Sequence, residues 1–365
     1  MRVMILHTPA DDATPGLLLH LREILERGAI DVETLVCSEA GLPLPCYAAE
    51  RLAAHAEELR ANIKERFEAW RPDAVVLSDR LNGSKFAARS LAEEMGIGVL
   101  VLKESVFPGR VFFAPDVHTS ASETDDESVC CAPLEEYQRY RLERALGEAY
   151  GIGKIESAPL PPAKNGQKTA LAIIDHSTYD SDGAALKRTW AVIEECKKRG
   201  DRVVLCERWR DVCGDHADCG RYVLLMDGDV SRRIPCGDEH LRGLVRDCDW
   251  CVTNGSLHAL EVLYFGRPVV LTDRCVYSGY GFTLDLQADE QAGQATEAIL
   301  RLGRIEAAHK EKFLRFLYGF LFSDLLEVDE AKRKFCGSSE RRVLDALFRA
   351  LPLERGMRVL AGATK

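Results

Sequence analysis

The chain has 365 residues, of which 46% are hydrophobic and 29% charged, and its formal net charge at pH 7 is −10. This composition is typical of a soluble globular protein with room for two domains of ordinary size. The acidic balance argues against broad nucleic-acid binding, which requires a basic surface. No apolar run approaches the roughly 20 residues of a membrane span, and the N-terminus lacks the layout of a signal peptide.

The 13 cysteines are scattered along the chain rather than spaced as a disulfide scaffold. Without an export signal they are expected to be reduced thiols in the cytoplasm. Cys206, Cys213, Cys219 and His216 could be drawn as zinc ligands, but no tight ligand pair lies among them, so we expect no metal site. The CxxC pair at residues 248–251 enters a strand, where a redox role is not expected.

The first half of the chain alternates predicted strands with predicted helices. Apolar runs predict strands at residues 3–6, 32–37, 74–77 and 98–102. Helical spacing of apolar residues predicts helices over 17–25, 47–70, 85–95 and 134–150. Residues 114–132 have no periodicity and are expected to form a loop.

The second half repeats this alternation after a Pro-rich linker at residues 158–166. Its predicted strands are residues 169–174, 202–206, 223–226, 250–253 and 269–272. Its predicted helices cover 184–198, 238–246 and a segment that begins at Ser256, and residues 293–350 are mostly helical. Two alternating patterns predict an α/β protein with two doubly wound parallel sheets facing across a cleft.

We therefore expect four parts. They are an N-terminal Rossmann-like domain over 1–157, the linker 158–166, a C-terminal Rossmann-like nucleotide-binding domain over 167–300 and a C-terminal helical region over 301–365. The last region is expected to cross back toward the N-terminal domain.

The most informative stretch runs from Cys251 to Glu261 and predicts a strand, a small polar turn and a helix. Asn254 and Ser256 would lie where backbone N–H groups favour an anion. Glu261 would lie about one and a half turns further on the same helix. A phosphate near Ser256, with Glu261 accepting from ribose hydroxyls, suits a ribosyl phosphate. The alternative is a helix N-cap in an ordinary α/β unit.

Five segments between residues 72 and 285 occur in the order of a known family's motifs. They are Pro72 to Leu77 with Asn82-Gly83, Gly96-Ile97 with Glu104 and Phe107-Pro108-Gly109, Asp180-Ser181, Asn254 to Val269, and Tyr277 to Thr283. In these residues the chain resembles the capsule polysaccharide biosynthesis proteins, whose best-understood members are retaining β-Kdo transferases of the GT-B fold.

The resemblance implies transfer of a CMP-activated acidic sugar such as Kdo to a glycan or glycolipid acceptor. It implies no cofactor and no metal, because CMP leaves as a monophosphate whose charge helix N-termini and hydroxyls can meet. The expected location is the cytoplasm, at the inner face of the membrane, with at most peripheral membrane association.

The resemblance also implies roles for individual residues. Glu104, directly after a strand, would face the sugar as acid/base or as a stabilising carboxylate. Asp79 and Asp116 are candidates for a second acidic role, and His176 and His118 lie in loops aimed at the cleft. The remaining substrate-binding candidates are Asn82, Asp180, Ser181, Asn254, Ser256, His258, Glu261, Tyr277 and Tyr280. Structural readings stay open for several: Glu104 as a solvated carboxylate, Asn82 as a turn former, and each histidine as a surface group.

Two departures from the family pattern leave other functions open. Ser105 stands where an acidic residue is expected beside Glu104, and Cys206 to Trp209 replaces an expected His-Pro pair. A non-catalytic nucleotide- or glycan-binding relative is one alternative. Another GT-B enzyme, such as a UDP-sugar epimerase, is the second.

Overall fold

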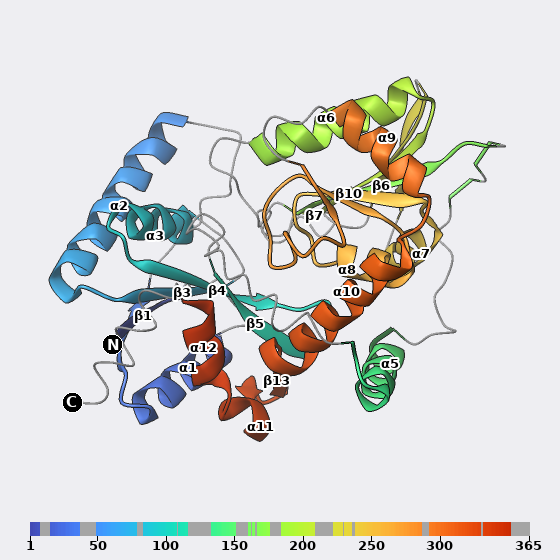
Figure 1. The fold of residues 1–365 in the computed structure, drawn as a ribbon. Coiled ribbons are helices and arrows are strands. Elements are labelled where there is room, and N and C mark those ends of the chain that lie inside the picture. The colour runs from blue at the N-terminus through green and yellow to red at the C-terminus, as the bar shows by residue number, and fades with distance from the viewer. Residues whose placement is uncertain are drawn as a thin grey trace. The chain divides into compact units, whose positions relative to one another are not determined.

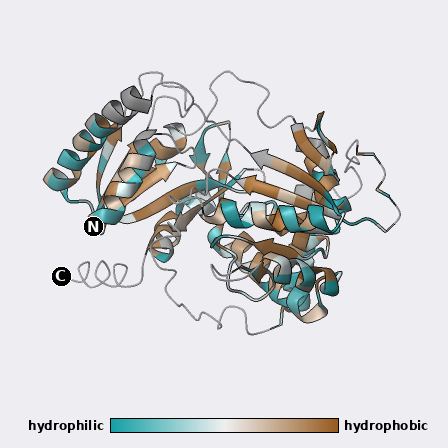
Figure 2. Ribbon diagram, turned by 90° about the horizontal axis from the view of Figure 1, so that it is seen from above, coloured by the Kyte–Doolittle hydropathy of each residue, from teal (hydrophilic) through white to brown (hydrophobic). Residues whose placement is uncertain are grey.

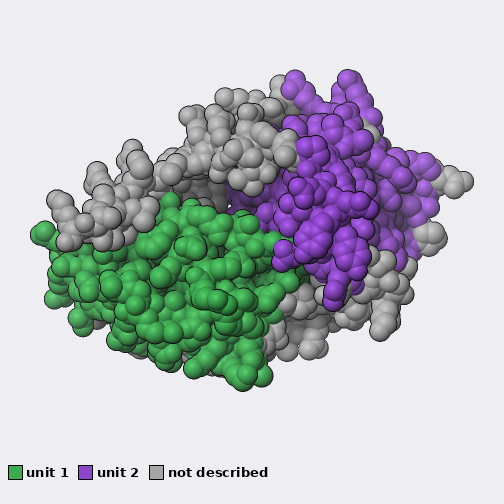
Figure 3. Space-filling model, turned by 60° about the horizontal axis from the view of Figure 1, so that its bottom comes forward, with its two compact units in different colours: residues 1–125, 320–365 green, residues 126–319 purple. Residues whose placement is uncertain are grey.

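The computed structural model describes residues 1–7, 15–36, 49–78, 83–107, 109–115, 133–150, 160–161, 163–164, 166–175, 184–208, 222–228, 230–235, 238–286, 292–329 and 331–351. Its contacts divide the chain into two compact units (Figure 3). Unit 1 comprises Met1–Asp125 and Phe320–Lys365, and unit 2 comprises Asp126–Gly319. Each unit contains a seven-stranded sheet.

Unit 1 is a mixed sheet with helices on both faces (Figure 1). Its strands are β1 (Arg2–His7), β2 (Asp31–Val36), β3 (Ala74–Ser78), β4 (Gly98–Glu104), β5 (Arg110–Pro115), β13 (Leu326–Asp329) and β14 (Lys334–Phe335). Its helices are α1 (Pro15–Arg27), α2 (Ala49–Trp70), α3 (Gly83–Glu94), α11 (Gly337–Glu340) and α12 (Val343–Ala350), with a π-helical segment η1 (Phe320–Asp324).

The strand order of this first sheet is β14-β13-β5-β4-β3-β1-β2. Strands β2, β1, β3 and β4 run parallel, whereas β5, β13 and β14 are antiparallel to their neighbours. Alternate residues of β1 point to opposite faces. Val3 and Ile5 pack with α1 and α12, while Met4 and Leu6 pack with α2 and α3.

Unit 2 holds the second sheet. Its strands are β6 (Thr169–Asp175), β7 (Arg202–Arg208), β8 (Tyr222–Asp227), β9 (Val230–Pro235), β10 (Trp250–Thr253), β11 (Val269–Leu271) and β12 (Leu284–Asp285). Its helices are α5 (Glu136–Tyr150), α6 (Ala184–Lys198), α7 (Asp238–Asp247), α8 (Ala259–Tyr264), α9 (Ala292–Leu302) and α10 (Ala307–Gly319).

The order of the second sheet is β12-β11-β10-β6-β7-β8-β9. The first five of these strands are parallel, and β8 and β9 complete the sheet as an antiparallel hairpin. One face packs on α6 and α9 through Ala170, Ala172 and Val252. In Figure 2 the strands of both sheets are largely hydrophobic and the helices carry most of the hydrophilic residues.

The predicted fold class is confirmed: the chain is an α/β protein with two Rossmann-like halves. Antiparallel strands that the sequence did not indicate extend the parallel core of each sheet. Residues 110–115 form β5, so the predicted loop over 114–132 starts too early. The C-terminal region is mostly helical, as predicted, and also contains the two short strands β13 and β14.

The C-terminal segment returns to the first sheet, as we expected, since β13 pairs with β5 through Leu326 and Val111. The division by packing differs from the predicted domain boundaries. Helix α5 and residues 301–319 fall in unit 2, whereas the predicted N-terminal domain contained α5.

Among the described helices, none is long and apolar enough to cross a membrane.

Phe67 provides a test of how α2 is held on the first sheet, because its ring is fully buried against β1 and β3. We expect Phe67→Ala to lower the stability of unit 1 by about 3–5 kcal/mol, the usual loss for a buried aromatic ring. Hydrogen exchange read on peptides of unit 1 measures this loss. The neighbouring Glu68→Ala is the control, because that side chain is 58% exposed, and a similar loss in both variants would contradict the packing described.

Candidate functional site

The candidate site lies at one edge of the second sheet. Strands β6, β7, β10, β11 and β12 are parallel, so their carboxyl ends meet at this edge. Ligands of open parallel sheets bind at such edges. The segments that leave β10 and β11 there, residues 254–258 and 272–283, contain most of the predicted binding residues in the described part of unit 2.

The turn after β10 is closed by its own hydrogen bonds. The backbone N–H of Ser256 donates to Thr253 Oγ1 at 3.0 Å, and the N–H of His258 donates to Ser256 Oγ at 3.4 Å. Gly255 has a φ of 112°, which favours glycine. The expectation that the Ser256 N–H points outward to an anion is therefore wrong, because that donor is used inside the turn.

The helix that follows the turn is short. Helix α8 begins at Ala259 and has six residues, so Ser256 precedes it. Glu261 is the third residue of α8 and lies in its first turn, not one and a half turns along a helix from Ser256. A carboxylate in the first turn interacts favourably with the positive end of the helix dipole.

Glu261 is the most unusual side chain of this edge. Only 2% of its side chain is exposed, and neither Oε1 nor Oε2 accepts a hydrogen bond from any described residue. His258 Nδ1 lies 3.5 Å from Oε2, without the geometry of a hydrogen bond. A buried carboxylate without donors is costly, so this group is suited to accept hydrogen bonds from a bound molecule.

Tyr277 fixes the turn from the neighbouring loop. Its ring is fully buried, and its hydroxyl donates to the carbonyl oxygen of Ser256 at 2.7 Å. Burial, with a smaller contribution from Cys275, raises the pKa of Tyr277 well above 10, so the hydroxyl remains a donor at neutral pH. This contact makes Tyr277 a support of the turn, whereas its predicted role as a binding residue stays a prediction.

Three threonines that the sequence did not single out hold the ends of β10 and β11 together. The Thr272 N–H donates to the Thr253 carbonyl at 2.9 Å, and the hydroxyls of Thr272 and Thr189 lie 2.6 Å apart. Arg188 Nε on α6 donates to the Thr272 carbonyl at 2.8 Å. A threonine at the end of each apolar strand was the signal that could have indicated this network.

The loop between β11 and β12 folds around Asp285. Its carboxylate accepts from the Gly279 N–H at 2.7 Å and from the Thr283 hydroxyl at 2.5 Å. Tyr280 is 42% exposed, and its ring stacks on Phe282 with centroids 5.9 Å apart. It also packs against Phe316, with centroids 4.9 Å apart, so Tyr280 is a partly exposed member of an aromatic cluster.

The structure brings part of the predicted site together. Asn254, Ser256, His258, Glu261 and Tyr277 lie in two adjoining segments of unit 2, and all of these except His258 are buried. Three further candidates of this half and four of the first half fall outside the described residues: His176, Asp180 and Ser181, and Asp79, Asn82, Asp116 and His118.

Glu104 lies in unit 1, where it is the last residue of β4 and is exposed to solvent. It pairs with Val111 across the antiparallel hairpin that β4 forms with β5. Ser105, which replaces the acidic residue of the family pattern, closes this hairpin. Its N–H donates to the Arg110 carbonyl at 2.9 Å, and its hydroxyl accepts from the Phe107 N–H at 3.2 Å.

The carboxyl edge of the first sheet also holds a buried cation that the sequence did not single out. Lys85 on α3 has no exposed surface, and its ammonium donates to the Ser78 hydroxyl at the end of β3. A lysine two residues after Asn-Gly, followed at helical spacing by Ala88 and Ala92, was the available signal. Within the described ranges, no group of three or more His, Cys, Asp or Glu side chains could hold a metal ion.

Comparison with known proteins gives matches among solved structures. No family model matches the chain, and no curated protein matches it. A β-Kdo 2,4-transferase, KpsC, of Thermosulfurimonas dismutans has 14% identity and a TM-score of 0.44, covering 95% of this chain and 98% of its own. The β-Kdo 2,7-transferase KpsC of the same organism has 11% identity and a TM-score of 0.45, covering 94% and 99%. A UDP-GlcNAc 2-epimerase of Neisseria meningitidis has 12% identity and a TM-score of 0.36, covering 96% and 100%.

The buried thiols of unit 2 lead to a prediction about alkaline stability. Burial raises the pKa of Cys196 and of Cys248 from about 9 to about 12, and it raises that of Cys251 well above 9. Above pH 9 the unfolded chain releases protons that the folded chain retains. The free energy of unfolding should therefore fall as the pH rises from 9 toward 12.

Urea unfolding at a series of pH values measures this decline, and Cys248→Ala should make it shallower. Native Cys248 and Cys251 should also resist iodoacetamide at pH 8, because the thiolate is the reactive form. Rapid alkylation of either thiol in the folded protein would contradict the burial described.

Proposed function

We propose that this protein is a glycosyltransferase that transfers a sugar from a nucleotide-activated donor. We propose further that this donor is a CMP-activated acidic sugar such as CMP-Kdo. The acceptor is a glycan or glycolipid of the cell surface, used in the cytoplasm at the inner face of the membrane. The observation that carries this proposal is the buried carboxylate of Glu261, which has no hydrogen-bond donor among the described residues.

The nucleotide half of the proposal rests on unit 2. Ribose hydroxyls are neutral donors, so they can satisfy a buried carboxylate without bringing a second charge into the site. Glu261 has two oxygens without hydrogen bonds for two hydroxyls, and we assign the buried side chains of Ser256 and Asn254 to the phosphate. We assign Tyr280, which is 42% exposed, to contact with the base or the sugar.

In the proposed reaction, the bond between the anomeric carbon and the CMP phosphate oxygen breaks. A new bond forms between that carbon and the acceptor hydroxyl oxygen, whose proton passes to a carboxylate. We assign the proton-transfer role to Glu104, with Asp79 or Asp116 as the second acidic group of a retaining mechanism. The positive charge that develops on the sugar is stabilised by these carboxylates.

A second candidate function is a non-catalytic nucleotide-binding protein. Ser105 favours it, because this residue supplies a turn hydrogen bond where the family pattern has an acidic side chain. Release of CMP from a candidate donor in the presence of an acceptor supports the enzyme. Binding of CMP without turnover supports the binding protein, and preference for UDP over CMP supports a UDP-sugar epimerase.

The nucleotide assignment is tested by Glu261→Gln. The change keeps the shape of the side chain and removes its charge, so we expect CMP binding to weaken about 10- to 100-fold. The unliganded protein should become more stable, because a neutral amide is less costly to bury than an unpartnered carboxylate. Calorimetric titration with CMP and thermal unfolding measure the two effects, and Ser256→Ala should also weaken CMP binding.

Glu297→Gln on α9 is the matched control, since that side chain is 61% exposed and the chemical change is the same. It should leave both CMP affinity and stability unchanged. Loss of stability in Glu261→Gln together with unchanged CMP affinity would show that Glu261 serves the fold alone.

The catalytic assignment is tested by Glu104→Gln. We expect turnover to fall about 100-fold or more, the usual scale for a positioned acid/base group, with CMP affinity nearly unchanged. The exposed Glu327→Gln in the same unit is the control, as this residue lies on β13, which is separated from β4 by β5. Turnover near the wild-type rate in Glu104→Gln would remove Glu104 from the mechanism.

A further inference from the structure

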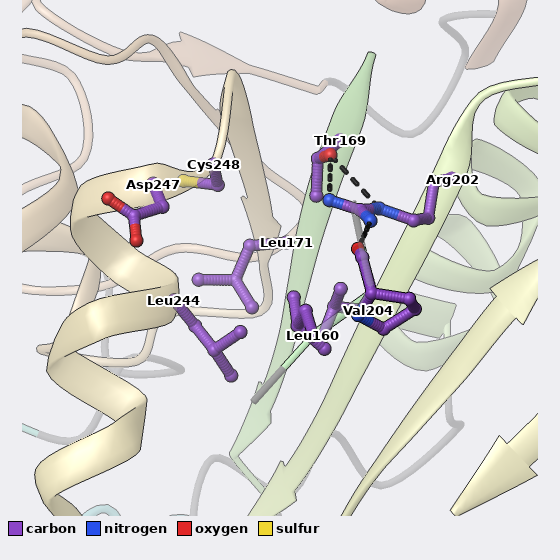
Figure 4. Close-up of a pocket in the computed structure, with 9 residues that line it drawn as sticks. Leu160, Thr169, Leu171, Arg202, Val204, Leu244, Asp247 and Cys248 are labelled. Atoms are coloured by element: carbon purple, nitrogen blue, oxygen red, sulfur yellow. Dashed lines mark hydrogen bonds between the residues drawn. The ribbon is translucent and has the colours of Figure 1, made fainter. Parts of the chain in front are cut away.

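A cavity of about 240 Å³ lies where β6 and β7 begin, at the opposite edge of the second sheet from the candidate site (Figure 4). Strand β6 has seven residues, so its two ends are about 20 Å apart. Leu160, Leu171, Val204 and Leu244 form an apolar wall. The cavity is therefore separate from the groups that we assign to the nucleotide.

One side of this cavity carries a buried cation, Arg202, which is 8% exposed. Its Nε and Nη2 donate to Thr169 Oγ1 at 3.1 and 2.8 Å, and its Nη1 donates to the Pro161 carbonyl at 2.6 Å. Both acceptors are neutral. Arginine remains charged in proteins and is seldom buried without a counter-ion, so this arrangement calls for an anion.

The described carboxylates near Arg202 are engaged elsewhere. Asp227 bonds to Gln167 at 2.8 Å and to Lys164 at 3.3 Å. Asp249 bonds to the Thr169 N–H at 2.8 Å and to Lys168 at 3.3 Å. Neither forms an ion pair with the guanidinium; they act on Arg202 only through longer-range attraction, which opposes the lowering of its pKa by burial.

One carboxylate, that of Asp247, lines the cavity, and its negative charge would repel an anionic ligand. Asp247 is bound by the Arg246 guanidinium through two contacts, at 2.7 and 2.9 Å, and its side chain is 49% exposed. The adjacent cation and the solvent screen its charge. In the view of Figure 4, Leu171 lies between Asp247 and Arg202.

Arg202 has hydrogen-bonding capacity left for a ligand. Each terminal nitrogen of a guanidinium carries two hydrogens, and each of these nitrogens donates only one bond here. A carboxylate accepts two N–H bonds from a guanidinium better than any neutral group does. The apolar wall next to the guanidinium suits a short hydrocarbon chain attached to that carboxylate.

We propose that this cavity is a binding site for a small organic acid with an apolar body, whose carboxylate pairs with Arg202. The bound acid contacts Leu160 and the strands β6 and β7. It therefore packs the segment that contains Leu160 and Pro161 against the sheet. The site is independent of the nucleotide proposal, since it uses none of the residues assigned there.

The test is calorimetric titration of the full chain with hexanoate, 1-hexanol and inorganic phosphate. We expect saturable binding of hexanoate, and affinities at least about 10-fold weaker for hexanol, which lacks the charge, and for phosphate, which lacks the chain. Arg202→Met should weaken hexanoate binding by about 10-fold or more. Arg199→Gln, a nearby charge outside the cavity with a side chain 41% exposed, should leave it within about twofold.

Arg202 also holds Thr169 and Pro161, so a second variant keeps the proposal testable if Arg202→Met does not fold. Leu244→Phe fills the cavity, leaves the guanidinium in place and should abolish hexanoate binding. Equal affinities for hexanoate and hexanol would overturn the proposal. Wild-type hexanoate binding in Leu244→Phe, or in a folded Arg202→Met, would also overturn it.

Discussion

Glu261 holds a carboxylate away from water without a hydrogen bond from any described residue. Such a group lowers the stability of the unliganded protein, and a ligand that supplies donors recovers that loss as binding free energy. Its place follows from the sheet, because α8 is a short helix that connects the parallel strands β10 and β11. The same connection brings the turn at Ser256 to the carboxyl edge.

The backbone groups of the neighbouring turn form hydrogen bonds with groups other than the Glu261 carboxylate. The Ser256 N–H is bound by Thr253, and the Ser256 carbonyl is bound by Tyr277. Thr272 is in turn held by Thr189 and by Thr253. With their own hydrogen bonds made, these groups keep the turn in one conformation, and the carboxylate is left for a bound molecule.

The parallel core of each sheet was predictable, because buried strands such as 74–77 and 250–253 are short apolar runs between helical patterns. The antiparallel strands were not. Strand β9 (Val230–Pro235) contains two exposed arginines and lacks a strand pattern of its own, so only its pairing with β8 makes it a strand. Strand β5 follows the pair Pro108-Gly109 in the sequence and leads into an aperiodic sequence segment, which hid its four apolar residues.

The candidate site was predictable in its residues and less so in its geometry. The motif placed Asn254, Ser256 and Glu261 together, but helix α8 starts three residues later than its pattern suggested, which changes the role of Ser256. Nothing local in the sequence indicated that Tyr277 binds the Ser256 carbonyl, because the two residues are 21 positions apart. Burial of Arg202 beside a cavity likewise arises only when β6, β7 and α7 pack together.

The most direct measurement is a thermodynamic cycle of four binding affinities: those of wild type and of Glu261→Gln, each for CMP and for 2′,3′-dideoxy-CMP. If the carboxylate accepts the ribose hydroxyls, wild type should bind CMP about 10- to 100-fold more tightly than the dideoxy compound. The variant should bind both with nearly equal affinity. Equal binding of the two nucleotides by wild type, or undiminished preference for CMP in the variant, would contradict the account of Glu261.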